Sequence, residues 1–131
     1  MKEYELLDGG TLRVRATTRA GLLTAALQGL MAASEPRTSE VDEKTERPFA
    51  FSAADFGTLL ADFLTSASKA AVEHKEAYED VRFTLITDKK AEGAFVGRPA
   101  ESFKSPPKQV KAGSDVAKNE EGEWETTVTL S

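Results

Sequence analysis

Residues 52–73, SAADFGTLLADFLTSASKAAVE, predict the helix around which the rest of the chain is arranged. The run from Ser52 to Asp55 has the S-x-x-D form of a capping box, which is typical of a helix start. The apolar residues after it recur at intervals of three and four, which places them on one helical face. They are Phe56, Leu59, Leu60, Phe63, Leu64, Ala67 and Ala71. We therefore expect an amphipathic helix that ends near Glu73.

A second amphipathic helix is predicted upstream of this one. Thr17 or Thr18 can cap its start, because a threonine hydroxyl accepts a hydrogen bond from a free backbone N–H there. The helical spacing continues to about Ser34. Its apolar stripe consists of Leu22, Leu23, Ala26, Leu27, Leu30 and Met31. We expect this stripe to face the core.

Alternation of apolar and polar residues predicts strands before and between the helices. Residues 2–7 and 11–16 alternate in this way. Asp8-Gly9-Gly10 is the predicted turn between them, because glycine accepts the positive φ angles of tight turns. Glu35 to Pro48 holds eight charged residues and two prolines, so we expect a loop or ragged edge that leads into a strand at Phe49 to Phe51.

Four more strands are predicted after the second helix. They cover residues 78–86, 93–98, 109–112 and 124–130, with a turn near Asp88 and another at Gly122. Helices and half-polar strands that each have one apolar face bury those faces together. The sequence therefore predicts a single α+β domain over residues 1–131. Its expected form is a two-layer sandwich with both helices on one face of a largely antiparallel sheet.

The composition excludes several kinds of site. The 131 residues include no cysteine, so the chain has no disulfide, thiolate zinc site or cysteine nucleophile. The one histidine, His74, lies near the end of the second helix without a catalytic partner at a recognisable spacing, and we assign it a structural role. No assembled catalytic site is recognisable, so we expect a protein that is not an enzyme. The chain also shows no leader or membrane-spanning pattern, and we expect it in the cytoplasm.

Charge is unevenly distributed along the chain. The net charge of −5 argues against bulk binding to nucleic acid or anionic lipid. Residues 97–118 nevertheless hold five basic and two acidic side chains. The segment from Lys104 to Lys108 could be a surface for a partner or an approaching RNA, or a solvated loop, and both readings stay open. We expect no direct contact with nucleic acid and no membrane contact.

Taken along nearly the whole chain, the sequence resembles the archease family. Leu7-Asp8 and the strand from Thr11 stand where that family has a Leu-Asp-His-Thr-Ala-Asp motif that runs into a strand. The alanine-rich first helix and the Asp55 to Leu64 pattern of the second follow in order. Gly97-Arg98-Pro99 is similar to a Gly-x-Pro between two family strands. Val110-Lys111-Ala112 and the closing strand from Trp124 complete the resemblance.

The resemblance implies an accessory role. Archeases are small protein cofactors of the GTP-dependent RNA ligase that seals tRNA halves, and they promote its guanylylation and turnover. The leading hypothesis is therefore an accessory protein that binds and activates such a ligase. The partner is expected on a face that carries Asp8, Arg98, Lys111 and Asp115. The alternative is a degenerate member of the same fold that serves as a binding or scaffolding domain. A hydrolase that uses carboxylates or serines is a third reading.

The resemblance also implies a metal site, usually assigned to calcium, from which this chain departs. The family aspartates correspond to about Thr11 or Leu12 and to Ser131. Calcium prefers several hard oxygen ligands that include carboxylates, so these replacements remove most of the charge that holds the ion. We therefore expect no metal and no cofactor. A relocated calcium site at Asp8 and Asp115 is the remaining alternative.

Overall fold

The computed structural model describes residues 3–7, 10–38, 43–104, 106–107, 109–112 and 116–130. It contains two helices, α1 (Arg19–Ser34) and α2 (Phe56–His74). The strands are β1 (Glu3–Leu7), β2 (Thr11–Ala16), β3 (Pro36–Thr38), β4 (Thr45–Ser52), β5 (Glu76–Ile86), β6 (Lys90–Phe103), β7 (Val110–Ala112), β8 (Ala117–Lys118) and β9 (Trp124–Leu130). Neither helix of the described part is long and apolar enough to cross a membrane.

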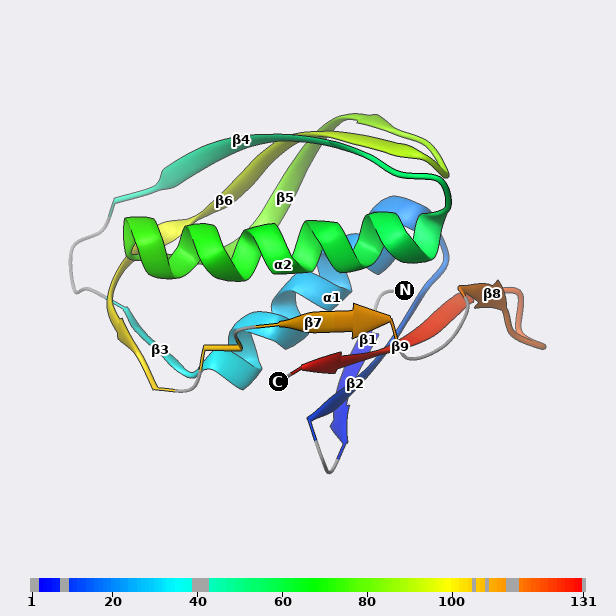
Figure 1. The fold of residues 1–131 in the computed structure, drawn as a ribbon, viewed down its shortest axis with the longest axis horizontal. Coiled ribbons are helices and arrows are strands. Elements are labelled where there is room, and N and C mark those ends of the chain that lie inside the picture. The colour runs from blue at the N-terminus through cyan, green and yellow to red at the C-terminus, as the bar shows by residue number, and fades with distance from the viewer. Residues whose placement is uncertain are drawn as a thin grey trace.

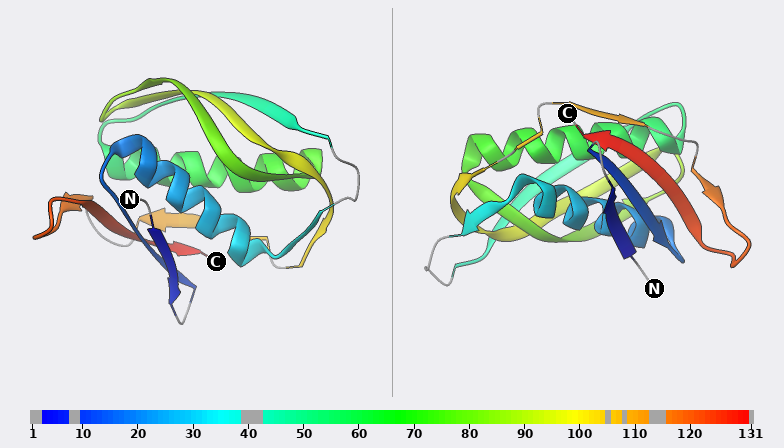
Figure 2. Two further views of the ribbon diagram at one scale, coloured as in Figure 1. Left: turned by 180° about the vertical axis from the view of Figure 1, so that it is seen from behind. Right: turned by 90° about the horizontal axis from the view of Figure 1, so that it is seen from below.

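The strands form two antiparallel sheets with the helices between them (Figure 1). One sheet has the order β1-β2-β9-β7, with β8 also paired to β9. In the other sheet, β3, β4 and β5 all pair with the long strand β6. Both helices contact both sheets, and the views in Figure 2 show the same arrangement from two other sides. The predicted α+β sandwich is confirmed, although its strands divide into two sheets where a single one was expected.

Helix α1 is buried on almost every side. Its predicted stripe lies in the core, but Thr24, Ala25, Gly29 and Ser34 outside that stripe are buried as well. The Thr24 and Ser34 hydroxyls donate to the carbonyl oxygens four residues earlier, at 2.9 Å and 2.8 Å, so their burial leaves no unpaired donor. The expectation of one apolar face was too narrow, because α1 packs against β1 and β2 below and β5 above.

Helix α2 begins one turn later than a capping box at Ser52 would require. Ser52 is the last residue of β4, and Asp55 is the N-cap. The Thr58 N–H donates to Asp55 Oδ1 at 2.8 Å, and this hydrogen bond lowers the pKa of the Asp55 carboxyl. The helix ends at His74, and Lys75 follows with a left-handed φ of 55°. The predicted apolar stripe of α2 is confirmed as buried.

An aromatic cluster joins α2 to the sheet of β6. The Phe63 ring of α2 lies 5.4 Å from the Phe49 ring and 5.3 Å from the Phe95 ring between centroids. Phe51 and Phe83 complete the cluster. Phe49 and Phe51 face inward because alternate residues of β4 point to opposite faces of the sheet.

Two strands, β3 and β8, lie where the sequence predicted none. β3 and the start of β4 replace much of the expected loop over residues 35–48. Within β4, exposed Glu46 and Pro48 alternate with half-buried residues. Because this segment is rich in charged residues and proline, its composition indicated a loop and not a strand. The short strand β8 pairs with β9 through a turn at Gly122, where φ is 80°.

Glycines in β6 let β5 approach closely. A Cβ at Gly93 or Gly97 would collide with the backbone of β5, at Arg82 and Ala77 respectively. The register between the two strands shifts beside both glycines. Gly97-Arg98-Pro99 lies inside β6, which extends at both ends beyond the strand of residues 93–98 that the sequence predicts. The resulting bulges increase the twist of this sheet over the helices.

Candidate functional site

The predicted partner face is distributed over both sheets. Arg98 is exposed on β6, where its Nε lies 2.6 Å from Oε1 of Glu79 on β5. Lys111 is exposed on β7 and is opposite Thr129 of β9 in the other sheet. Helix α2 lies between β6 and β7 (Figure 1). Asp8 and Asp115 lie outside the described residues. This set therefore stays a prediction, and Arg98 and Lys111 do not share a sheet.

The residues implied for calcium can be compared with what the ion needs. β2 begins beside the end of β9, because Thr11 is opposite Thr129 and the Leu130 N–H donates to the Gly10 carbonyl at 2.7 Å. Leu12 is fully buried in the core, and its side chain has no oxygen that could bind the ion. Ser131 lies outside the described residues. No group of three or more metal-binding side chains occurs in the described part of the chain. The described residues here do not fit calcium.

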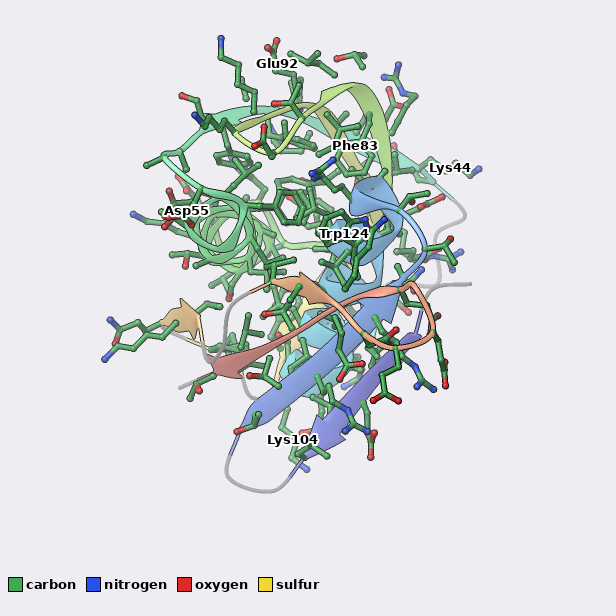
Figure 3. The ribbon with its side chains drawn as sticks, turned by 90° about the vertical axis from the view of Figure 1, so that its right-hand side faces the viewer. Lys44, Asp55, Phe83, Glu92, Lys104 and Trp124 are labelled. Carbon is green, nitrogen blue, oxygen red and sulfur yellow. The ribbon has the colours of Figure 1, made fainter. Side chains whose placement is uncertain are left out.

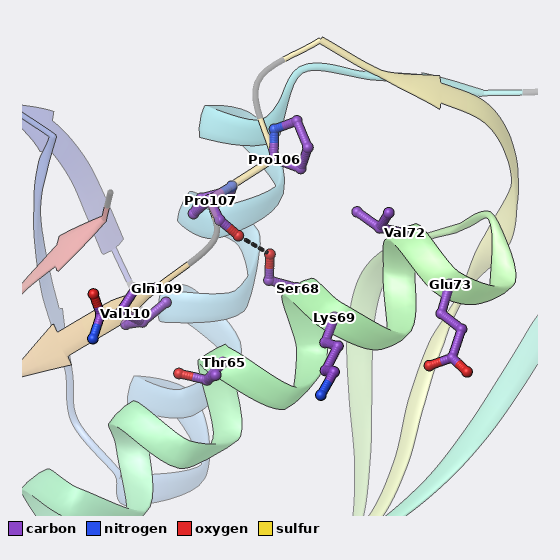
Figure 4. Close-up of a pocket in the computed structure, with 9 residues that line it drawn as sticks. All are labelled: Thr65, Ser68, Lys69, Val72, Glu73, Pro106, Pro107, Gln109 and Val110. Carbon is purple, nitrogen blue, oxygen red and sulfur yellow. Dashed lines mark hydrogen bonds between the residues drawn. The ribbon is translucent and has the colours of Figure 1, made fainter.

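A groove of about 560 Å³ lies between α2 and residues 106–107 and 109–110 (Figure 4). The helix contributes Thr65, Ser68, Lys69, Val72 and Glu73, and the opposite wall consists of Pro106, Pro107, Gln109 and Val110. The groove exists because residues 106–107 and 109–112, which follow the end of β6 at Phe103, lie alongside α2. Its surface is mainly apolar, which is typical of a binding site.

The described residues of the groove form no recognisable catalytic arrangement. The Ser68 hydroxyl donates to the Pro107 carbonyl oxygen at 2.8 Å, so this hydroxyl fixes the wall and has no base beside it in the described residues. Glu73 and Lys69 are exposed, and their charged ends point away from Pro106 and Pro107 in Figure 4. The groove is therefore a candidate binding site and not a candidate active site. The sequence contained two signals of it that we did not use, namely Val72 outside the buried stripe of α2 and the Pro106-Pro107 pair.

A partly buried ion pair joins β4 to the start of β5. The Arg47 guanidinium holds the Glu76 carboxylate by two hydrogen bonds, at 3.2 Å and 3.3 Å. The Tyr78 hydroxyl donates to Glu76 Oε1 at 2.8 Å, and Glu76 and Tyr78 are only 7% and 1% exposed. Burial, followed by the Glu76 interaction, raises the pKa of Tyr78 well above its usual value. None of these three residues lines the groove beside α2 described above, and we assign the cluster a structural role.

Both helices begin at the end of the molecule that faces the viewer in Figure 3, and Trp124 lies there. Its ring contacts two cations. The Arg19 guanidinium lies 4.7 Å from the Trp124 ring centroid, and the Lys118 ammonium lies 5.2 Å from it. Arg19 also lies 5.9 Å from the Phe56 ring. Cation–π contacts of this kind attach the start of β9 to both helix starts. Because the ring is engaged within the chain, we assign this cluster to packing.

The architecture defines the class of protein: an α+β sandwich with the archease-like fold. An archease from Thermotoga maritima, described as a possible chaperone, superposes with a TM-score of 0.61 at 12% identity over 97% of this chain and 92% of that one. Protein 1598 of Methanobacterium thermoautotrophicum superposes with a TM-score of 0.51 at 12% identity, over 98% and 96% of the two chains. No family model and no curated protein matches the sequence.

Proposed function

We propose that this protein is an accessory factor that binds a GTP-dependent tRNA or RNA ligase and promotes its guanylylation and turnover. The observation that carries the proposal is the archease-like fold, which extends over 97% of the chain. At 12% identity this likeness concerns the fold, and the activity is our inference from the family resemblance. The binding groove beside α2 supports a role in association over one in catalysis.

The accessory role is proposed to operate without calcium and without another cofactor. Leu12 is part of the apolar core at one of the positions implied for the ion, so no carboxylate from that position can reach it. The chain's own contribution is then to present a rigid surface to the ligase. Such a surface stimulates ligation through contact alone.

Multiple-turnover ligation of tRNA halves tests this proposal. The GTP-dependent ligase of the same organism is assayed with and without the protein, and with calcium or with a chelator. We expect more product per ligase molecule when the protein is present, to the same extent in both conditions. Stimulation that disappears with the chelator would contradict the calcium-independent form, and the site at Asp8 and Asp115 would then be the one to examine.

A second candidate is a binding or scaffolding domain that has kept the fold without ligase activation. The burial of Leu12 supports it, because an apolar core side chain stands at one of the positions implied for a metal ligand. This candidate predicts no stimulation of the ligase at any protein concentration. Affinity capture with the intact chain would then identify the partner by mass spectrometry, with the ligase absent from the captured proteins.

A further inference from the structure

The strand β1 leaves apolar side chains uncovered at one edge of its sheet. Three of the five exposed large apolar side chains of the described residues belong to it, namely Tyr4, Leu6 and Leu7. Tyr4 and Leu6 are opposite Val14 and Leu12 of β2, which are fully buried. Because directly opposite residues point to the same face of a sheet, Tyr4 and Leu6 continue the face that forms the core at β2.

Helix α1 covers this face only in part. The Tyr4 ring lies against the helix, since a Cβ added at Gly29 would be 3.1 Å from its Cδ2 atom. Tyr4 and Leu6 nevertheless stay 42% and 44% exposed. Figure 2 shows the reason, because β1 forms the margin of the sheet and β2 and β9 lie inward of it. A strand that continued the sheet beyond β1 would cover both side chains.

The backbone of β1 is open to such a strand. Within the described part of the chain β1 pairs only with β2, so backbone N–H and C=O groups point outward along its other edge. Proteins protect edge strands from pairing with proline, lysine or a bulge. β4, at an edge of the other sheet, holds Pro48. β1 has the sequence Glu-Tyr-Glu-Leu-Leu and an uninterrupted register with β2, so it lacks these three devices.

The order of side chains in β1 selects a second copy of the same strand. In an antiparallel pair the residues with outward backbone groups must face each other, so a two-fold axis passes through a residue position. An axis at Glu5 places Tyr4 opposite Leu6 of the second copy, and Leu6 opposite its Tyr4. An axis at Tyr4 or at Leu6 leaves one of these two side chains without an apolar partner. The pattern of β1 is therefore self-complementary about Glu5.

The opposite face of the sheet tolerates this register. Glu5 points to that face, where its Oε2 lies 2.7 Å from Nη2 of Arg13 on β2. Like charges directly opposite each other destabilise paired strands. Each of the two Glu5 carboxylates at the axis already has an arginine of its own chain beside it, and this arginine offsets the repulsion between them.

We propose that β1 is the interface of a symmetric homodimer, in which it pairs antiparallel with β1 of a second copy about a two-fold axis at Glu5. The sheets of the two copies then form one continuous sheet, and Tyr4 and Leu6 of both copies are covered. The dimer does not depend on the ligase, because only the edge of this chain forms it. A strand of five residues makes a small interface, so we expect a weak dimer.

Sedimentation velocity of the wild-type chain, from about 1 μM to about 1 mM, is the first test. We expect a monomer–dimer equilibrium with a dissociation constant below about 1 mM. A chain that stays monomeric at about 1 mM overturns the proposal. Growth beyond a dimer overturns it as well, because an interface with a two-fold axis is closed.

A charged substitution localises the interface. Leu6→Lys places an ammonium in each apolar pair and is expected to weaken dimerisation at least about tenfold. Its matched control is Leu85→Lys, because Leu85 is 40% exposed on β5 of the other sheet. The control should leave the equilibrium unchanged, and circular dichroism confirms that both variants are folded. Equal losses in the two variants overturn the proposal.

Single cysteines test the register, because the chain has none of its own. Glu5→Cys places two thiols opposite each other at the axis, with Cβ atoms about 5 Å apart. Arg13→Cys is the matched control, since it breaks the same ion pair. Position 13 lies three strand spacings, about 14 Å, from its counterpart in the dimer.

Under a mild oxidant, covalent dimers of Glu5→Cys should form at least about tenfold faster than those of Arg13→Cys, because a disulfide needs Cβ atoms about 4 Å apart. Equal rates, or no covalent dimer of Glu5→Cys, overturn the proposal.

The ligation assay separates the dimer from the accessory function. If β1 dimerises as expected and the ligase is never stimulated, the accessory function fails and the dimer stands. If the chain is monomeric and Leu6→Lys abolishes stimulation while Leu85→Lys keeps it, β1 binds a strand of the ligase. That result overturns the assignment of a second copy.

Discussion

At the scale of single residues, the Glu76 carboxylate shows how a buried charge is made tolerable. Two hydrogen bonds from Arg47 and one from Tyr78 replace the water that Glu76 loses on folding. Removing a single partner is costly in such a cluster, because the remaining charge stays buried without compensation. The stability of a variant that lacks one partner of Glu76 therefore tests whether β4 and β5 are placed as described.

Tyr78→Phe should lower the free energy of unfolding by about 1–3 kcal/mol, since it removes a hydrogen bond to a charged group and adds none. The buried ring itself is kept. Tyr4→Phe is the control, because Tyr4 is 42% exposed. Urea denaturation followed by circular dichroism measures both. Equal stability of the Tyr78 variant and the wild type would contradict the hydrogen bond.

The raised pKa of Tyr78 also predicts a pH dependence. A folded-state pKa above the unfolded one stabilises the protein fully below about pH 10, the ordinary tyrosine pKa. That contribution is lost as the pH rises through the folded-state pKa. Stability should therefore fall in alkali more steeply in the wild type than in Tyr78→Phe. Parallel stability curves above pH 10 would show that Tyr78 is not shielded in the folded state.

At the scale of elements, β6 organises one sheet because three other strands pair with it. Its glycines allow β5 to bulge and come close, which no other residue would permit at the same separation. The helices are determined more locally: Thr18 and Asp55 accept hydrogen bonds from Gly21 and Thr58 and so specify where α1 and α2 begin.

Gly97→Ala should destabilise the protein by about 1–3 kcal/mol, because the new methyl group would overlap the β5 backbone at Ala77. The control is Gly57→Ala in the first turn of α2, where the nearest atom is Asp55 Oδ1 at 3.4 Å from the added Cβ. This control should be neutral or stabilise by up to about 1 kcal/mol, since alanine favours helix. Thermal unfolding of both variants measures the difference. Identical effects at the two glycines would contradict the close approach of β5 to β6.

At the scale of the whole molecule, an apolar core holds the two sheets and the helices together. Both sheets pack onto the helices through apolar side chains, and Leu12 belongs to that core. A ligand that binds only the folded state raises the unfolding temperature by mass action. Millimolar calcium should therefore leave the melting temperature within about 1 °C of its value in chelator. A rise of several degrees would reveal a calcium site, and Asp8→Asn with Asp115→Asn would then be expected to abolish it.

The sequence determined the elements that depend on near neighbours. Capping and helical spacing predicted both helices, and alternation predicted the β1–β2 hairpin and the strands of residues 78–86 and 124–130. These patterns are readable because the period of a helix or strand is set by residues within one or two turns. The resemblance to the archease family predicted the arrangement of these elements in an archease-like fold, and the structural likeness confirms that fold.

Only the tertiary structure decided how the elements divide between two sheets. That division depends on pairing between distant segments, such as β2 with β9 and β4 with β6. The burial of α1 on almost every side, the contact of Arg47 with Glu76 and the groove beside Val72 have the same origin. Each joins residues that are far apart along the chain, and local periodicity carries no information about such contacts. These contacts and the groove are thus properties of the assembled fold.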